Sequence, residues 1–166
     1  LHHSESNPGS SLDLTLAVNG VPVATAELKN PLTGQGLEHA MTQYRTDRNP
    51  HDRIFAKRTL VHFAVDPHQV AMNTSLAGQD TRFLPFNQGS AGAGHPGTSG
   101  NPPSGGYDTA YLWEQVWERE AWLELIENFI HTEDDRVIFP RFHQWHAVRS
   151  ILAATYAAGA GTDRLV

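Results

Sequence analysis

The sequence contains no cysteine, and this absence excludes disulfide bonds, cysteine-ligated zinc and a thiol nucleophile. No apolar run approaches the roughly 20 residues that a helix needs to cross a bilayer. The polar N-terminal residues also lack the hydrophobic segment of a signal peptide. We therefore expect a cytoplasmic protein with no membrane partner. Because the sequence starts at Leu1 rather than at methionine, we also expect a fragment or a processed piece.

Sequence motifs that would define other protein classes are missing as well. There is no G-x-x-x-x-G-K-S/T phosphate-binding loop, and the glycine-rich stretch over residues 89–106 contains no lysine. There is no G-x-S-x-G nucleophile elbow and no EF-hand loop for calcium. We therefore expect no ATP hydrolysis by this chain.

Acidic residues outnumber basic ones, which gives a formal net charge of −6. This balance argues against a protein that coats nucleic acid, although carboxylates that hold a metal ion also add negative charge to a nuclease. One stretch, residues 45–58, is basic. It is either a solvated helix and loop or an edge that contacts DNA phosphates. In the second case the DNA-binding residues are Arg45, Arg48, Arg53, Lys57 and Arg58.

The pattern of apolar residues predicts one domain, since 166 residues can bury a single core. Asn19-Gly20 predicts a hairpin turn. Period-two alternation predicts strands on both sides of this turn and two further on, over residues 12–18, 21–29, 59–65 and 69–74. Helical spacing predicts helices over residues 37–46, 108–131 and 143–158. Because helices and strands alternate, we expect an α/β fold with a mixed β-sheet flanked by helices.

Residues 87–106 differ from the rest of the chain, because they hold half of its 14 glycines. This composition predicts a long flexible loop outside the core. The helix expected after the loop carries three tryptophans, which are more typical of a core than of a cofactor site. We place all three in the core: Trp113, Trp117 and Trp122.

Three charged residues on the first two strands form the most informative feature of the sequence. Glu27 and Lys29 share one face of their strand, because side chains alternate with period two, and we expect Leu28 to point the other way, toward the core. On the first strand, Asp13 lies on the face opposite the leucines. If the two polar faces coincide, two carboxylates and one ammonium group converge.

The register of the hairpin decides whether these charges converge. A plain two-residue turn would pair Asp13 with Ala26 and leave Glu27 on the wrong face. One extra residue, with Gly20 in the left-handed conformation, would set Asp13 opposite Thr25 and diagonal to Glu27. The second register also buries the leucines of the first strand, so we predict it.

Two carboxylates and a lysine in this arrangement suit metal-dependent cleavage of phosphodiesters. Mg²⁺ prefers oxygen ligands and takes one or two carboxylates with waters and substrate phosphate. Asp13, Glu27 and the backbone carbonyl of Leu28 would be the ligands, and Lys29 would position a water or neutralise charge. The alternative is a surface charge pair at a sheet edge.

The spacing of Asp13 and Glu27-Leu28-Lys29 resembles that of the PD-(D/E)xK nucleases. More specifically, the sequence SLDLTLAVNGVPVATAELKN over residues 11–30 resembles the nuclease motif of type I restriction enzyme R subunits, which are motor and endonuclease subunits. The resemblance continues through YRTD at 44–47, TRFLPFN at 81–87, GYDTAYLW at 106–113 and FPRFHQWHAV at 139–148.

This resemblance implies that residues 1–131 form an endonuclease domain with a PD-(D/E)xK core that uses Mg²⁺ to cleave double-stranded DNA. It implies modification and specificity subunits as partners. For residues 132–166 it implies a linker and the first helix of a helicase motor, where Gln144 would bind the adenine of ATP in the full-length subunit. Because few residues precede Asp13, we expect the core to be truncated at its N-terminus.

One departure from the family pattern leaves the function open. Family members often carry Gln-x-x-x-Tyr after the E-x-K strand. Tyr44 matches the tyrosine and is a fourth catalytic candidate, but Ala40 stands in place of the glutamine. The alternative function is a non-catalytic, nuclease-like scaffold that docks the motor or partner subunits.

Overall fold

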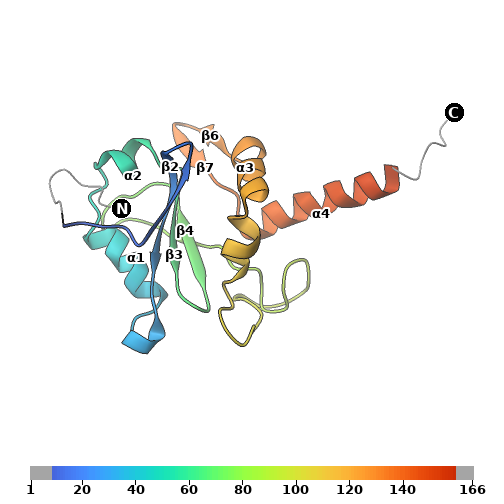
Figure 1. The fold of residues 1–166 in the computed structure, drawn as a ribbon, viewed down its shortest axis with the longest axis horizontal. Coiled ribbons are helices and arrows are strands. Elements are labelled where there is room, and N and C mark those ends of the chain that lie inside the picture. The colour runs from blue at the N-terminus through green and yellow to red at the C-terminus, as the bar shows by residue number, and fades with distance from the viewer. Residues whose placement is uncertain (1–8, 160–166) are drawn as a thin grey trace.

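The computed structural model describes residues 9–159, which form a mixed five-stranded sheet between two layers of helices (Figure 1). The strands lie in the order of the sequence, and only the β2–β3 pair is parallel. They are β1 (Leu14–Val18), β2 (Val21–Leu28), β3 (Val61–Val65), β4 (Val70–Asn73) and β5 (Leu84–Pro85). The predicted α/β class with a mixed sheet is confirmed.

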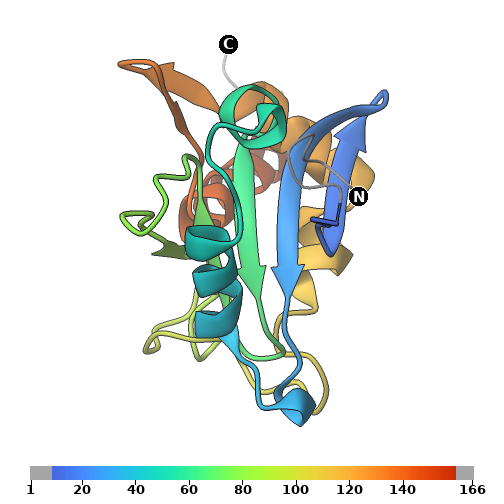
Figure 2. The same ribbon diagram turned by 90° about the vertical axis from the view of Figure 1, so that its left-hand side faces the viewer.

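Helices α1 (Leu37–Thr46) and α2 (Arg53–Lys57) lie in the crossover between the parallel strands β2 and β3, after the short helix η1 (Pro31–Thr33). A parallel pair needs such a crossover, because its second strand must start at the same end as its first. Figure 2 shows α1 lying across the front face of the sheet. The opposite face is covered by three elements: η2 (Leu112–Val116), α3 (Arg119–Asn128) and the start of α4 (Phe142–Gly159).

The side chains of β3 show how the two faces divide. Val61, Phe63 and Val65 pack into the main core against η2, α3 and α4. His62 and Ala64 alternate with them and face α1, as period two requires. Every residue of β3 is buried, so β3 is the central strand of both cores.

The β1–β2 hairpin differs from our prediction in where its register shifts. The turn is a plain two-residue turn with Val18 opposite Val21, and both Asn19 (φ 50°) and Gly20 (φ 79°) are left-handed. The shift comes from a bulge further along, where the pairing skips Val23.

Beyond the bulge, Leu14 lies opposite Ala26, and the next step along the strands sets Asp13 beside Glu27. The predicted register, with Asp13 opposite Thr25, is therefore wrong, because Thr15 takes that place. The prediction that a bulge restores a common face is confirmed.

Residue 12 marks a second correction, because β1 begins at Leu14 rather than at Leu12. The chain bends at Asp13. Leu12 therefore packs with Tyr44, Ile54, Phe55 and Leu76 on the α1 side, whereas Leu14 and Leu16 pack into the main core.

The single helix predicted over residues 108–131 is wrong. It is divided into η2, which is π-helical, and α3, and the chain then forms a hairpin of β6 (His131–Glu133) and β7 (Arg136–Ile138). The Glu118 carboxylate caps the new helix by accepting the N–H groups of Glu120 and Ala121. Such a cap starts a helix and so favours the division at this point.

Two of the three tryptophans lie where we predicted them. Trp122 is buried and Trp117 packs against the main core. Trp113 is 42% exposed, which corrects its predicted place in the core. η2 buries Leu112 and Val116 instead.

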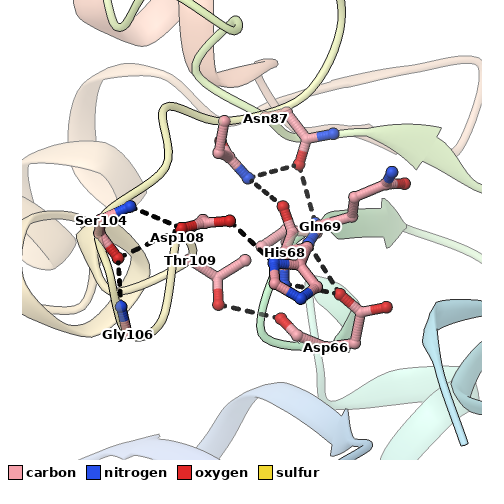
Figure 3. A network of polar contacts seen from close by, with 10 residues as sticks. Asp66, His68, Gln69, Asn87, Ser104, Gly106, Asp108 and Thr109 are labelled. Atoms are coloured by element: carbon pink, nitrogen blue, oxygen red, sulfur yellow. Dashed lines mark hydrogen bonds and ion pairs between the residues drawn. The ribbon is translucent and has the colours of Figure 1, made fainter. Parts of the chain in front are cut away.

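The loop over residues 87–106 contains no buried residue, although Ala93 packs against the main core, so the prediction that the loop adds no buried residue to the core is confirmed. It is nevertheless tied together, since Gly89 N–H donates to Gly100 and Ser90 N–H to Thr98. Figure 3 shows that the end of the loop is also anchored to the β3–β4 turn. There Asp108 Oδ2 lies 2.8 Å from His68 Nδ1, and Asn101 donates to the backbone carbonyl of His68.

The segment after residue 131 begins inside the same core. Phe139, Phe142 and Trp145 pack with the sheet and α3, while the rest of α4 projects away from the body (Figure 1). The predicted boundary at 131 therefore separates residues that pack together, and the motor assignment of residues 132–166 stays a prediction. No helix within residues 9–159 is long and apolar enough to span a bilayer.

Candidate active site

The bend at Asp13 directs its carboxylate to the end of β2. Asp13 Oδ2 accepts the backbone N–H of Leu28 at 2.9 Å. The ammonium group of Lys29 lies 3.9 Å from the same oxygen. The Asp13 side chain is 39% exposed and that of Lys29 13%, so this corner of the site can be reached from solvent.

Glu27 lies at the buried end of the same site and is fully enclosed. Its Oε1 accepts from Arg48 Nε at 2.8 Å and lies 2.6 Å from Arg48 Nη2. Its Oε2 is buried without a hydrogen-bond partner among the described residues. Burial raises the pKa of Glu27 to about 7, although Arg48 acts to lower it.

The carboxylates of Asp13 and Glu27 interact electrostatically. The charge of Asp13 raises the pKa of Glu27 beyond the effect of burial. Two carboxylates this close repel unless a proton or a cation lies between them. The sequence prediction that Asp13, Glu27 and Lys29 converge agrees with this geometry.

Three buried polar residues next to this site share hydrogen bonds: Thr25, Tyr44 and His62. Thr25 Oγ1 lies 2.8 Å from both the Tyr44 hydroxyl and His62 Nδ1. Burial raises the pKa of Tyr44 well above its usual value and lowers the pKa of His62 to about 3. Tyr44 is fully buried, as Glu27 is, and its catalytic role stays a prediction.

The five basic candidates for DNA binding divide into three groups by their exposure. Arg53, Lys57 and Arg58 are exposed on and just after α2. Arg45 is partly covered, since its Nε donates to the Thr81 carbonyl and its guanidinium lies over the Phe83 ring. Arg48 is only 5% exposed. This corrects its predicted place at a phosphate-contacting edge, because its donors are engaged inside the protein.

A cavity of about 440 Å³ adjoins the site at the ends of β2 and β3. Leu28 and Lys29 line it together with Tyr107 and Trp113, whose ring centroids lie 5.8 Å apart. Leu28, which we expected to point to the core, is 43% exposed there. The site therefore opens onto a largely apolar wall.

Gln144 lies in the first turn of α4, far along the chain from the charged site. Its side-chain oxygen accepts the N–H of Arg141 at 2.8 Å, as a residue at a helix start commonly does. Its side chain is exposed. Its role toward adenine stays a prediction.

The family model that describes the N terminus of the type I restriction enzyme R protein matches residues 3–90. This range covers slightly more than half of the chain and includes the whole five-stranded sheet. The chain belongs to this R-protein family. No curated protein and no solved structure matches the R-protein region described here.

Sequence reasoning missed two buried residues of this R-protein region that the structure places next to the site, Thr25 and His62. Thr25 shares the face of Glu27 by period two, and this signal alone could have indicated it. His62 is a histidine in an otherwise apolar strand, a pattern that gives no sign of its partner 37 positions earlier.

Proposed function

We propose that this R-protein region is a Mg²⁺-dependent endonuclease of the PD-(D/E)xK type that hydrolyses phosphodiester bonds in double-stranded DNA. The observation that carries the proposal is the convergence of Asp13, Glu27 and Lys29 at the end of β2. The family supports it independently, since R proteins belong to restriction enzymes.

The residues present fit a magnesium ion. Glu27 Oε2 is a buried oxygen without a hydrogen-bond partner among the described residues, and the Asp13 carboxylate acts directly on Glu27. Leu28 donates its N–H to Asp13, and in a strand the N–H and C=O of one residue point to the same side. No group of three or more acidic or histidine side chains within residues 9–159 could hold a metal ion. Our ligand set therefore consists of two carboxylates, Asp13 and Glu27, and takes the backbone carbonyl of Leu28 as its third oxygen. When bound, the ion would lower the pKa of a water and offset charge on the phosphate.

Lys29 is the residue that would act on the reacting groups without binding metal. Its ammonium group lies 3.9 Å from Asp13 Oδ2, where it can hold a water or neutralise a phosphoryl oxygen. The exposed Arg53, Lys57 and Arg58 are our candidates for contacts to DNA phosphates.

The remaining proposals rest on the family. We propose that the R subunit containing this region works in the cytoplasm with modification and specificity subunits. We also propose that ATP is bound by the full-length subunit, with Gln144 at the adenine, and is not hydrolysed by this region.

The test is metal-dependent nicking of supercoiled plasmid by the restriction complex that contains this region. Asp13→Asn and Lys29→Met should each lower the rate by roughly 10²-fold or more, while the exposed Asp80→Asn control should not. Both changes keep the side-chain size, so the fold should survive. Wild-type rates for Asp13→Asn would exclude the catalytic proposal.

A second candidate is a non-catalytic scaffold that docks the motor or partner subunits. Ala40 in place of the expected glutamine favours it, and so does the pairing of Glu27 Oε1 with Arg48. The same experiment separates the two candidates, because a scaffold would tolerate both Asp13→Asn and Lys29→Met.

A further inference from the structure

Arg48 makes more polar contacts than its place in a loop would suggest. It follows α1 and is only 5% exposed. Its Nε donates to Glu27 Oε1 at 2.8 Å, its Nη1 to Ser10 Oγ at 2.9 Å and its Nη2 to the Ser11 carbonyl at 2.8 Å. All three nitrogens of the guanidinium group are therefore engaged.

These contacts join two segments of the site that lie apart in the sequence. Glu27 belongs to β2, whereas Ser10 and Ser11 precede β1, which begins at Leu14. Asp13 lies between Ser11 and β1, at the bend of the chain. Holding the Ser11 carbonyl next to Glu27 fixes where this bend lies and so where the Asp13 carboxylate points.

We propose that Arg48 is a positioning residue of the site. It sets the separation of the Asp13 and Glu27 carboxylates by holding the Ser11 backbone next to the Glu27 carboxylate. The inference rests on the proposed function for its consequence in metal binding, but its geometric part stands without metal. A planar guanidinium group suits this role, because its donors point in fixed directions, whereas a lysine ammonium is a point charge.

The first readout is the amide exchange of Leu28, whose N–H donates to Asp13 Oδ2. In Arg48→Met, the Leu28 amide should exchange several-fold faster, because its acceptor is no longer held in place. The amide of Ala64 in the buried β3 should keep its rate relative to global unfolding. Arg53→Met, which removes an exposed arginine near Arg48 in the sequence, is the matched control and should change neither rate.

The second readout is Mn²⁺ binding without DNA, measured by calorimetry on the R subunit. Arg48→Met should weaken binding by about 10-fold or more, as is usual when a residue that orients a metal ligand is lost. Arg48→Lys keeps a charge beside Glu27 but cannot hold Ser10, Ser11 and Glu27 together. It should therefore recover stability while keeping the fast Leu28 exchange and the weak Mn²⁺ binding.

The outcomes distinguish this inference from the proposed function. Unchanged Leu28 exchange in Arg48→Lys, or in a folded Arg48→Met, would overturn the positioning role, as would Mn²⁺ binding equal to wild type. If the wild-type protein binds no Mn²⁺ but Leu28 exchange still accelerates in both variants, the proposed function fails and the positioning role holds.

Discussion

The hydroxyl of Tyr44 and the ring of His62 both contact one oxygen, Thr25 Oγ1, each at 2.8 Å. The three residues come from α1, β3 and β2, so a single threonine joins the helix to the central strands. A hydroxyl can donate one hydrogen bond and accept others. This oxygen is therefore the hydrogen-bond partner of two buried side chains at once, on the face of β2 that also carries Glu27.

Tyr44→Phe should lower the free energy of unfolding by about 1 kcal/mol, because it removes one buried hydrogen bond and leaves Thr25 bonded to His62. DNA cleavage should stay within a few-fold of wild type, because the hydroxyl is fully buried. Urea unfolding and plasmid nicking measure the two effects. A large loss of cleavage with normal stability would restore Tyr44 as a catalytic residue.

Glu27→Ala should destabilise the fold, although Glu27 belongs to the proposed site. It leaves the Arg48 guanidinium buried without its charge partner, a change that costs about 3–5 kcal/mol. Glu38→Ala removes a carboxylate that pairs with Arg45 and whose side chain is 80% exposed. This change should lower the free energy of unfolding by less than about 1 kcal/mol. Denaturant unfolding of both variants checks the difference, and equal costs would contradict it.

The ring of His62 should stay neutral in the folded protein down to about pH 4, because burial lowers its pKa to about 3. In the unfolded chain the ring takes up a proton below its ordinary pKa of 6.5. The unfolded state therefore binds more protons between these values, and the His62 contribution to stability falls as the pH drops from 6.5 toward 3. The nitrogen chemical shifts of the His62 ring across this pH range measure its titration. A titration midpoint near pH 6 would contradict the prediction.

The exposed His68 should titrate above its ordinary pKa of 6.5, because its hydrogen bond with Asp108 favours the protonated ring and Asp66 adds to this. The same hydrogen bond lowers the pKa of Asp108 below 3.8. The pair should therefore hold the loop best from about pH 4 to 6.5. Its contribution is lost as the pH rises through the raised pKa of His68 or falls through the lowered pKa of Asp108.

An NMR titration of His68 in the wild-type protein and in Asp108→Asn measures this coupling. The variant should titrate at a lower pH than the wild type, and amide exchange at Ser104, whose N–H donates to Asp108, should accelerate. An unchanged His68 midpoint would show that the contact does not persist in solution.

Gly20→Ala should destabilise the β1–β2 hairpin by about 1–2 kcal/mol, because residue 20 is left-handed and an added Cβ strains that conformation. Within residues 9–159 no atom lies within 4 Å of the added carbon, so the expected cost is backbone strain. Gly106→Ala is the matched control, since its surroundings are equally open and its φ is not left-handed. Thermal unfolding compares the two, and equal losses would mean that the turn conformation is not the cause.

The sequence by itself determined the α/β class, the Asn19-Gly20 turn and the placing of Asp13, Glu27 and Lys29 in or next to two neighbouring strands. These follow from period-two alternation and from the left-handed preference of Asn-Gly, which act over a few residues. The resemblance to type I R subunits was also carried by local motifs, and the family match over residues 3–90 agrees with it.

Only the tertiary structure decided how these residues meet. The bulge that skips Val23 sets the register beyond the turn, and the turn chemistry gave no sign of it. Arg48 looked like a surface cation within a basic stretch, yet it is buried because its partners lie 21, 37 and 38 positions away. A residue's local sequence carries no information about such distant partners, whereas the structure shows that the buried guanidinium group has a carboxylate partner, without which its charge would be costly.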